Sequence, residues 1–240
     1  MFQLEDRLWW YSGMRSIAGA LLESGPRGFD GSTHLDVGCG TGYSMLWLRR
    51  KLKTKLSFGV DLSPIAAELW KVRGIDTATR ASADALPFMT GKIDLLTCFD
   101  VLYQLEDDRV LEALSEFKRV LKPSGWLLIR EPAYDWLRGA HDEAVGTRHR
   151  FTRVELISKL SSAGFAVHRA TYANALLLWL ALPHRWLSLG RNGHSDVRPV
   201  PEILNRTFRF ALNLESRIVR RMNLPLGLSV MLLAQCPASD

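Results

Sequence analysis

The run Leu35-Asp36-Val37-Gly38-Cys39-Gly40-Thr41-Gly42 decides the fold of this chain. The residues before it, 34–37, read as the end of a buried strand. Those after it, 43–51, have apolar residues at helical spacing and contain neither glycine nor proline. Glycine tolerates positive φ and lets a ligand approach the backbone closely, and the start of a helix presents free N–H groups. A strand, alternating glycines and a helix therefore predict a nucleotide-binding turn.

The spacing of the glycines and two acidic residues narrows the kind of ligand. A dinucleotide fingerprint is G-x-G-x-x-G, whereas this run is G-x-G-x-G, and Tyr43 stands where the third dinucleotide glycine would be. Asp36 lies inside the turn, where its charge repels a pyrophosphate and attracts an ammonium group. A second predicted strand, over residues 55–60, ends in Asp61, which is placed to accept from two ribose hydroxyls.

These motifs resemble the class I S-adenosylmethionine-dependent methyltransferases, of the bacterial small-molecule kind known as methyltransferase type 11 like. The resemblance extends through Ala83-Asp84-Ala85-Leu86-Pro87-Phe88, Asp94-Leu95-Leu96 and residues 121–126, and it covers residues 30–170. It implies S-adenosyl-L-methionine as the cofactor. The cofactor-binding residues that it implies are Asp36, Gly38, Gly40, Gly42, Asp61, Leu62, Asp84 and Ala85.

The same resemblance gives each of these positions a role. The glycines make room for the methionine end of the cofactor, which Asp36 anchors directly or through water. Asp61 takes the ribose hydroxyls, and Asp84 takes the adenine amino group, with Leu62 and Leu86 as apolar walls. A helix or turn cap is the alternative for Asp84.

Strands and helices alternate beyond the turn, which is typical of a parallel sheet with helices on both faces. Expected strands cover residues 75–80, 93–99, 124–130 and 165–172, and expected helices cover residues 7–23, 63–73, 107–121 and 152–163. Ser63 and Pro64 favour a helix start, and Thr152 with Glu155 forms a capping box. The family places a final strand, here residues 228–236, antiparallel beside the sixth. We therefore expect an α/β, Rossmann-like three-layer sandwich with a mostly parallel seven-stranded sheet and an antiparallel last strand.

We expect one methyltransferase domain over residues 1–240, because this length suits a single α/β domain and the chain has no internal repeat. Residues 1–28 would be an N-terminal helical cover, residues 29–172 the cofactor-binding core, and residues 173–225 an apolar and basic helical insertion before the last strand. The N-terminus lacks the regions of a signal peptide. A cytoplasmic location is expected, with the inner membrane face as the alternative.

Acceptor-binding residues are expected where the fourth and fifth strands end, since open α/β sheets bind ligands at the carboxyl ends of their strands. The leading helix often lies across the pocket in this family, so its Tyr11 and Arg15, one turn apart, are included. Packing against the sheet is the alternative for Trp9 and Trp10. The candidate acceptor-binding residues are Tyr11, Arg15, Tyr103, Tyr134, Arg148 and Arg150.

The loop after the fifth strand carries His141-Asp142-Glu143 and then Arg148-His149-Arg150-Phe151-Thr152, which resembles a bacterial subgroup with an H-D-E and R-R-Y/F-T pattern. His141 is the candidate general base because the ordinary pKa of histidine lies near neutrality; a structural histidine is the alternative. Arg148 and Arg150 would clamp a phosphate or carboxylate, or tie the loop to acids such as Glu131. Adjacent residues do not converge on one ion from a helix face, so no metal is expected.

The positive charge of the chain is concentrated in its C-terminal part. Residues 1–135 hold 17 Lys and Arg against 18 Asp and Glu, whereas residues 136–240 hold 14 against 7. This asymmetry favours an anionic partner, with solvated helix faces as the alternative. The apolar run 173–182 is too short to span a bilayer. With the basic helix expected over 202–222, it would form an interfacial element or a lid over the pocket.

The expected function is methyl transfer to a small-molecule or lipid-like, anionic acceptor, by in-line O-methylation. Gln104 stands where the family often has histidine, so the alternative is a non-catalytic cofactor-binding protein that serves as a partner or membrane-surface subunit. A nicotinamide-dependent short-chain reductase is excluded because no tyrosine has lysine four residues later. The chain lacks the base-flipping motif of nucleic-acid methyltransferases, so no nucleic acid is expected. Three scattered cysteines predict buried thiols.

Overall fold

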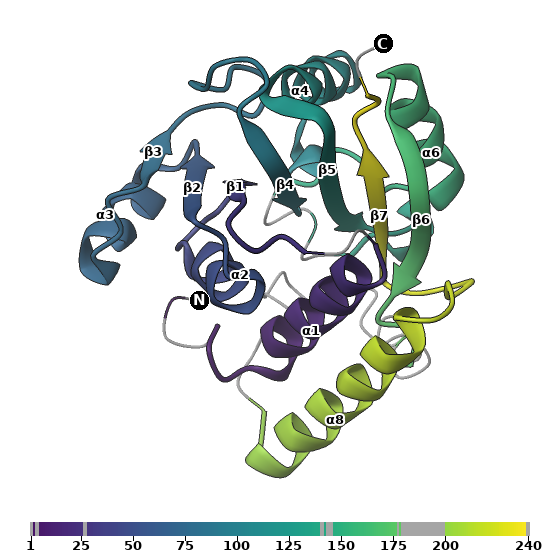
Figure 1. The fold of residues 1–240 in the computed structure, drawn as a ribbon. Coiled ribbons are helices and arrows are strands. Elements are labelled where there is room, and N and C mark those ends of the chain that lie inside the picture. The colour runs from purple at the N-terminus through teal and green to yellow at the C-terminus, as the bar shows by residue number, and fades with distance from the viewer. Residues whose placement is uncertain are drawn as a thin grey trace.

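The computed structural model describes residues 2, 5–25, 28–139, 142, 146–176, 178 and 200–238. Within them, seven strands form one sheet in the order β3-β2-β1-β4-β5-β7-β6 (Figure 1). The strands are β1 (Thr33–Val37), β2 (Leu56–Asp61), β3 (Ala78–Arg80), β4 (Ile93–Phe99), β5 (Leu121–Pro132), β6 (Ala166–Ala173) and β7 (Ser229–Gln235). The first five pair in parallel, and β7 lies antiparallel between β5 and β6. The expected mostly parallel sheet with an antiparallel last strand is confirmed.

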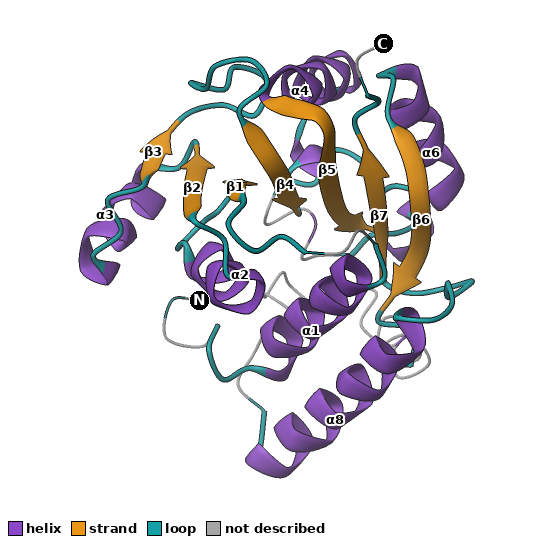
Figure 2. Cartoon of the chain, in the orientation of Figure 1, coloured by secondary structure: helices purple, strands orange, loops and turns teal. Residues whose placement is uncertain are grey.

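Helices cover both faces of this sheet and complete a three-layer sandwich (Figure 2). They are α1 (Trp9–Glu23), α2 (Tyr43–Leu52), α3 (Pro64–Arg73), α4 (Asp107–Val120), α6 (Arg153–Ser162) and α8 (Glu202–Val219), with the short 3-10 helices η1 (Leu102–Gln104) and η2 (Asp135–Leu137). Residues of α4 and α6 pack on one face of the sheet. Residues of α1, α2 and α8 pack on the other.

The starts of two helices follow from local sequence. The Ser63 hydroxyl accepts from the N–H of Ala66, with Pro64 at the first helical position. The Thr152 hydroxyl likewise accepts from the N–H of Glu155. Both predicted helix starts are confirmed, but only the Thr152 half of the capping box is formed, because the Glu155 carboxylate lies 2.8 Å from Nε2 of His149.

Two strands begin three residues away from their predicted start. β3 begins at Ala78 and not at residue 75, because the N–H of Ile75 still donates to Trp70 and closes the end of α3. β5 begins at Leu121 and not at residue 124, because Leu121 already pairs with Ile93 before a bulge shifts the register. Proline and glycine in residues 122–125 therefore interrupt the strand without delaying its start.

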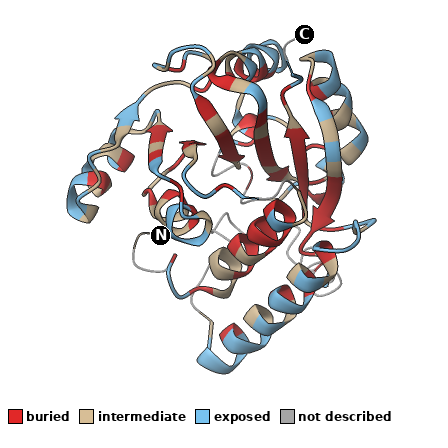
Figure 3. Ribbon diagram, viewed as in Figure 1, coloured by how far each residue is buried: buried red, intermediate tan, exposed pale blue. Residues whose placement is uncertain are grey.

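Helix α8 belongs to the same globular unit as the sheet. It lies alongside α1 (Figure 1), and Leu212 fits so closely over Gly13 that a Cβ at Gly13 would lie 2.2 Å from its Cδ1 atom. Leu212 and Val219 are fully buried in this layer. The strands at the centre of the sheet and the inner side of α1 are buried, whereas the outward side of α8 is exposed (Figure 3).

Candidate cofactor and acceptor site

The glycine turn joins β1 to α2. Gly38, Gly40 and Gly42 have φ of 73°, 52° and 79°, a region that glycine adopts without strain. A Cβ at Gly38 would lie 2.0 Å from Val101, whereas a Cβ at Gly40 would meet no atom within 4 Å. The turn is therefore packed at its base and open at Gly40, where a ligand can approach the backbone.

Asp61, at the end of β2, lies beside the open part of the turn. Its Oδ2 accepts from the N–H of Gly40 at 2.8 Å and its Oδ1 from the N–H of Ser63 at 2.9 Å. The two bonds fix the carboxylate between the turn and the start of α3. Leu62, the next residue, is 62% exposed and presents an apolar surface next to this carboxylate.

Asp36 is enclosed at the end of β1. Its side chain is buried, and its Oδ1 accepts from the Thr97 hydroxyl at 2.5 Å. Burial raises the pKa of Asp36 to about 7, against the lowering effects of the Thr97 hydrogen bond and the nearby Arg130 charge; Asp61 adds to the rise.

Asp84 lies at the rim and already has a cationic partner. Its Oδ2 accepts from Nε of Arg109 at 2.6 Å and from a second nitrogen of the same guanidinium. Ala85 is exposed and its N–H donates to the carbonyl of Ser82. An adenine amino group at Asp84 would therefore share this carboxylate with Arg109.

The N-terminal segment closes over the turn from the side of α1. The Glu5 carboxylate accepts from the Thr41 hydroxyl at 2.7 Å and also pairs with Arg73. Arg15 donates to the carbonyl of Glu5 at 3.0 Å, and its guanidinium lies 4.5 Å from the centre of the Tyr43 ring. Arg15 thus holds the N-terminal segment and the turn together. No sequence motif had pointed to the ion pair between Glu5 and Arg73.

Tyr11 lies one turn before Arg15 in α1, near the charges of Asp100 and Arg130 at the ends of β4 and β5. Burial raises the pKa of its phenol, and the charges of Glu5 and Asp100 raise it further, while Arg130 opposes them. The Arg130 guanidinium pairs with Asp100 and lies 5.0 Å from the centre of the Phe99 ring. Arg130 therefore lies near the candidate acceptor-binding residue Tyr11, and no sequence motif had pointed to it.

Glu131 shapes the loop that follows β4. Its fully buried carboxylate accepts from the N–H groups of Val101, Leu102 and Tyr103, at 3.3, 2.9 and 3.1 Å. Tyr103 is thereby fixed at the start of η1, and its hydroxyl accepts from the Gln104 amide at 2.8 Å.

Tyr134 follows β5 in an aromatic cluster. Its ring stacks on Tyr172 at 4.9 Å and on Trp136 at 5.5 Å between ring centres. The exposed Trp136 extends this cluster to the surface. Tyr134 therefore presents an aromatic surface beside the loop that carries η2.

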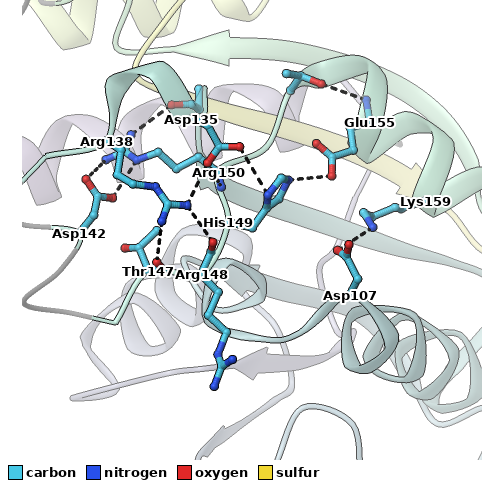
Figure 4. A network of polar contacts seen from close by, with 12 residues as sticks. Asp107, Asp135, Arg138, Asp142, Thr147, Arg148, His149, Arg150, Glu155 and Lys159 are labelled. Atoms are coloured by element: carbon cyan, nitrogen blue, oxygen red, sulfur yellow. Dashed lines mark hydrogen bonds and ion pairs between the residues drawn. The ribbon is translucent and has the colours of Figure 1, made fainter.

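The two candidate arginines of the next loop have different surroundings (Figure 4). Arg150 is buried and donates through two nitrogens to Asp142, at 2.8 and 3.0 Å, and through a third to the Ala133 carbonyl. Arg148 points away from this network and pairs with Glu106 at 2.6 Å, both side chains being more than half exposed. Both arginines pair with nearby acids, as the alternative expected, but the partner of Arg150 is Asp142 and not Glu131.

The proposed base, His141, lies outside the described residues. His149 lies nearby in the sequence, and its Nε2 is 2.8 Å from Glu155 while its Nδ1 is 3.5 Å from Asp135 (Figure 4). Both ring nitrogens of His149 therefore have carboxylate neighbours. In the described part of the chain no group of acidic, histidine or cysteine side chains could hold a metal ion.

No helix in the described ranges is long and apolar enough to cross a membrane. Cys39, Cys98 and Cys236 are free and buried, as the sequence predicted.

Residues 35–129 match a family model described as a methyltransferase domain. These residues therefore form a methyltransferase domain, and the strand order of the sheet around them is that of the class I S-adenosylmethionine-dependent methyltransferases. The match begins at the glycine turn and ends in β5, so it spans the strands that carry Asp36, Asp61 and the loop after β4. No curated protein sequence matches the chain.

Solved structures of low sequence identity share the fold of this methyltransferase. The complex between the Haloferax volcanii Trm112 methyltransferase activator and a methyltransferase matches at 19% identity and a TM-score of 0.64, covering 99% of this chain and 93% of that one. Geranyl diphosphate C-methyltransferase from Streptomyces coelicolor A3(2) matches at 18% identity and a TM-score of 0.59, covering 91% and 77%. The [4+2]-cyclase SpnF matches at 21% identity and a TM-score of 0.57, covering 94% and 81%.

The residues at the carboxyl edge of the sheet fit the cofactor of this family, S-adenosylmethionine. Gly40 offers open space where a side chain would stand, and the Asp61 carboxylate lies directly beside it. Asp36 supplies a carboxylate at the end of the adjacent strand. These groups match a ligand with hydroxyls at one end and an ammonium at the other.

Proposed function

We propose that this methyltransferase moves a methyl group from S-adenosylmethionine to an oxygen of a small, anionic, lipid-like acceptor. The observation that carries the proposal is the Asp61 carboxylate, fixed by the Gly40 N–H beside the open face of the turn. Bound S-adenosylmethionine supplies an activated methyl group on a sulfonium. The protein is then required mainly to align the acceptor with the S–CH₃ bond.

The residues proposed to bind the methyl donor, S-adenosylmethionine, lie mainly at the ends of β1 and β2. Asp61 would accept from the ribose hydroxyls, and Asp36 would accept from the ammonium of the methionine end. Leu62 and Ala85 would flank the adenine, whose amino group would reach Asp84 next to Arg109. Because Gly38, Gly40 and Gly42 have no side chains, they leave room for the methionine end of the cofactor.

Two features of this edge of the sheet favour a small, anionic acceptor. The N-terminal segment is fastened over the turn through Glu5, Thr41 and Arg73, and α1 places Tyr11 near Asp100 and Arg130. Tyr103 and Tyr134 extend this edge with phenol rings. Arg15 and Arg130 supply positive charge for an anionic acceptor, whereas buried Arg150 supports the loop and exposed Arg148 would meet a charged group at the rim.

The acceptor oxygen loses its proton as its bond to the methyl carbon forms and the S–CH₃ bond breaks. His141 is the proposed base, and its substitution by alanine should lower kcat by about 10²-fold while cofactor affinity stays the same. Unchanged turnover in His141→Ala would remove this role.

A transfer assay with methyl-labelled S-adenosylmethionine tests the proposal. Carboxylic acids, phenols and prenyl diphosphates would be offered as acceptors, and the position of the label would be read by ¹³C NMR. An O-methyl product that the Asp61→Ala variant does not form supports the proposal. Binding of S-adenosylhomocysteine without transfer to any acceptor would favour the non-catalytic alternative.

A second proposal, peripheral contact with an anionic membrane, is favoured by the outward face of α8. Ile203 and Phe210 are 74% and 70% exposed there, and Leu214 lies exposed one turn beyond Phe210. Exposed apolar side chains beside arginines are typical of helices that lie in a membrane interface. The arginines of this helix and the turn after it are Arg206, Arg209, Arg217, Arg220 and Arg221.

The charges on α8 favour an anionic surface over a neutral one. Of its two glutamates, Glu215 is fully buried and accepts from backbone N–H groups of residues 174 and 176. Glu202 alone is exposed. Within the described ranges, Arg220 pairs with Glu23 at 3.6 Å, and the other four arginines make no ion pair.

Co-sedimentation with phosphatidylcholine vesicles, with and without phosphatidylglycerol, tests this contact. The protein should pellet with the anionic vesicles at low salt and be released at high salt. The double variant Ile203→Ser/Phe210→Ser should stay in the supernatant. The control Ile65→Ser/Val154→Ser, with exposed residues of 70% and 75% on other helices, should still pellet. Equal loss in both variants, or no binding by the wild type, would contradict the proposal.

A further inference from the structure

Two polar side chains lie beside Asp36 in the apolar centre of the sheet. His34 in β1 and Thr97 in β4 are both fully buried. β1 and β4 pair in parallel with Asp36 opposite Thr97, so the three side chains share one face of the sheet. Burying a polar group costs free energy unless it is hydrogen-bonded. The hydrogen bonds of His34 and Thr97 therefore indicate their role.

The hydrogen bonds run in one direction. The Thr97 hydroxyl donates its single hydrogen to Asp36 Oδ1 at 2.5 Å. While Asp36 is ionised, the hydroxyl hydrogen is used by its carboxylate, so Nε2 of His34, 2.9 Å from the Thr97 oxygen, is the donor of that bond. His34 is therefore the neutral Nε2–H tautomer, and its Nδ1, which has no partner, remains an acceptor. Burial lowers the pKa of His34 to about 3, which keeps the ring neutral.

The second oxygen of Asp36 is left available. Among the described residues, Oδ2 accepts no hydrogen bond. It is also not one of the fully enclosed side-chain atoms that lack a partner. Oδ2 is therefore not fully enclosed, and it belongs to a residue of β1 that lies just before the glycine turn.

We propose that Thr97 and His34 are positioning residues for the cofactor: His34 holds the Thr97 hydroxyl, which fixes Asp36 Oδ1 and directs Oδ2 to the cofactor ammonium. The inference rests on the proposed role of Asp36 in cofactor binding. It adds that the affinity depends on a hydroxyl and an imidazole that touch no ligand.

The charged and titratable groups around Asp36 set the pH at which this effect is measured. Arg130 on β5 favours the carboxylate and Asp61 on β2 disfavours it. Burial raises the pKa of the neighbouring Cys39 and Cys98 thiols, which stay neutral. Loss of the Thr97 hydroxyl would remove one of the groups that favour the ionised form of Asp36. The carboxylate would then bind an ammonium only at higher pH.

Calorimetric titration with S-adenosylhomocysteine, from pH 6 to pH 9, tests the proposal. Thr97→Val keeps the shape of the side chain and should weaken binding about tenfold at pH 7, with the midpoint of the pH profile about one unit higher. Thr97→Ser retains the donor and should restore the wild-type profile. Thr171→Val is the matched control, because Thr171 is also fully buried and hydrogen-bonded but lies on β6. This control should lose stability and keep its affinity.

Wild-type affinity and pH profile in Thr97→Val, or failure of serine to restore them, would overturn the positioning role alone. A wild-type protein that does not bind S-adenosylhomocysteine would overturn the proposed function together with it. NMR of the imidazole nitrogens in the ligand-free wild type adds a reading that does not depend on binding. At pH 8, where Asp36 is ionised, His34 should be the neutral Nε2–H tautomer, and an Nδ1–H or cationic ring would show that the chain of hydrogen bonds is wrong.

Discussion

Replacing Asp61 by alanine should separate cofactor binding from folding. Each oxygen of this carboxylate accepts one backbone N–H, from Gly40 at 2.8 Å and from Ser63 at 2.9 Å. Each oxygen has a further lone pair, which can accept from a ribose hydroxyl. Hydrogen bonds to a charged group are worth about 1.5–3 kcal/mol. Losing the ribose contacts should therefore weaken binding of S-adenosylhomocysteine by about 10- to 150-fold.

Asp94→Ala is the matched control for the loss of the backbone bonds. Asp94 lies at the start of β4, on the opposite edge of the sheet, and its carboxylate accepts from the N–H of Thr33 at 2.8 Å and from Lys122 at 2.7 Å. Both variants should melt at a lower temperature, and calorimetry should find weaker ligand binding only in Asp61→Ala. Equal affinity of Asp61→Ala and the wild type would refute the ribose role, and equal weakening in both variants would assign the effect to stability.

Five further variants test other parts of the site. Gly40→Ala should cost only about 1–2 kcal/mol of stability from its positive φ, yet weaken S-adenosylhomocysteine binding at least tenfold, whereas Gly38→Ala should lower the melting temperature further because its Cβ would overlap a neighbour at 2.0 Å. Arg150→Met should destabilise the fold by about 3 kcal/mol in urea unfolding, since it removes the partner of a buried carboxylate, while the exposed Arg148→Met should change stability by less than about 1 kcal/mol. Burial raises the pKa of Asp36 to about 7, so its protonated form stabilises the ligand-free protein at low pH and this stability is lost as the pH rises through 7. Asp36→Asn should remove that loss, which is on the order of 4 kcal/mol between pH 4 and pH 8, and an unchanged pH dependence of unfolding would contradict it.

Local sequence signals were sufficient to predict the features that depend on a short segment alone, such as helix starts and the glycine turn. Ser63-Pro64 and the pair Thr152 with Glu155 each specify a helix start through one hydrogen bond within the segment, and both starts are confirmed. The glycine turn is also local, because positive φ at alternating positions requires glycine. The antiparallel last strand came from the family resemblance, since nothing local to residues 228–236 fixes its direction.

Contacts between distant segments could not be predicted in this way. Glu5 meets Arg73 across 68 positions, and Thr97 meets Asp36 across 61. Only the folded sheet brings such side chains together. One signal was available for Thr97, because it is a polar residue inside the otherwise apolar run of β4. A hydroxyl buried in β4 requires a hydrogen-bond partner, and the partner is Asp36, a proposed cofactor-binding residue.

The loop after β5 shows why residue type alone does not distinguish two arginines. Arg148 and Arg150 both suggested an anion clamp, because guanidinium groups bind carboxylates and phosphates. The fold buries Arg150 against Asp142 and leaves Arg148 at the surface beside Glu106. Burial and partner, which depend on the whole loop, decide between a structural and a binding arginine.

A crystal structure grown with S-adenosylhomocysteine tests the central claim most directly. The proposed function predicts density across the carboxyl ends of β1 and β2, with the ribose hydroxyls on Asp61 and the ammonium on Asp36 Oδ2. The ligand should cover Gly40, where a Cβ would meet no other atom within 4 Å. Density at another place, or none at ligand concentrations well above those at which such sites saturate, would contradict the assignment of this edge as the methyltransferase site.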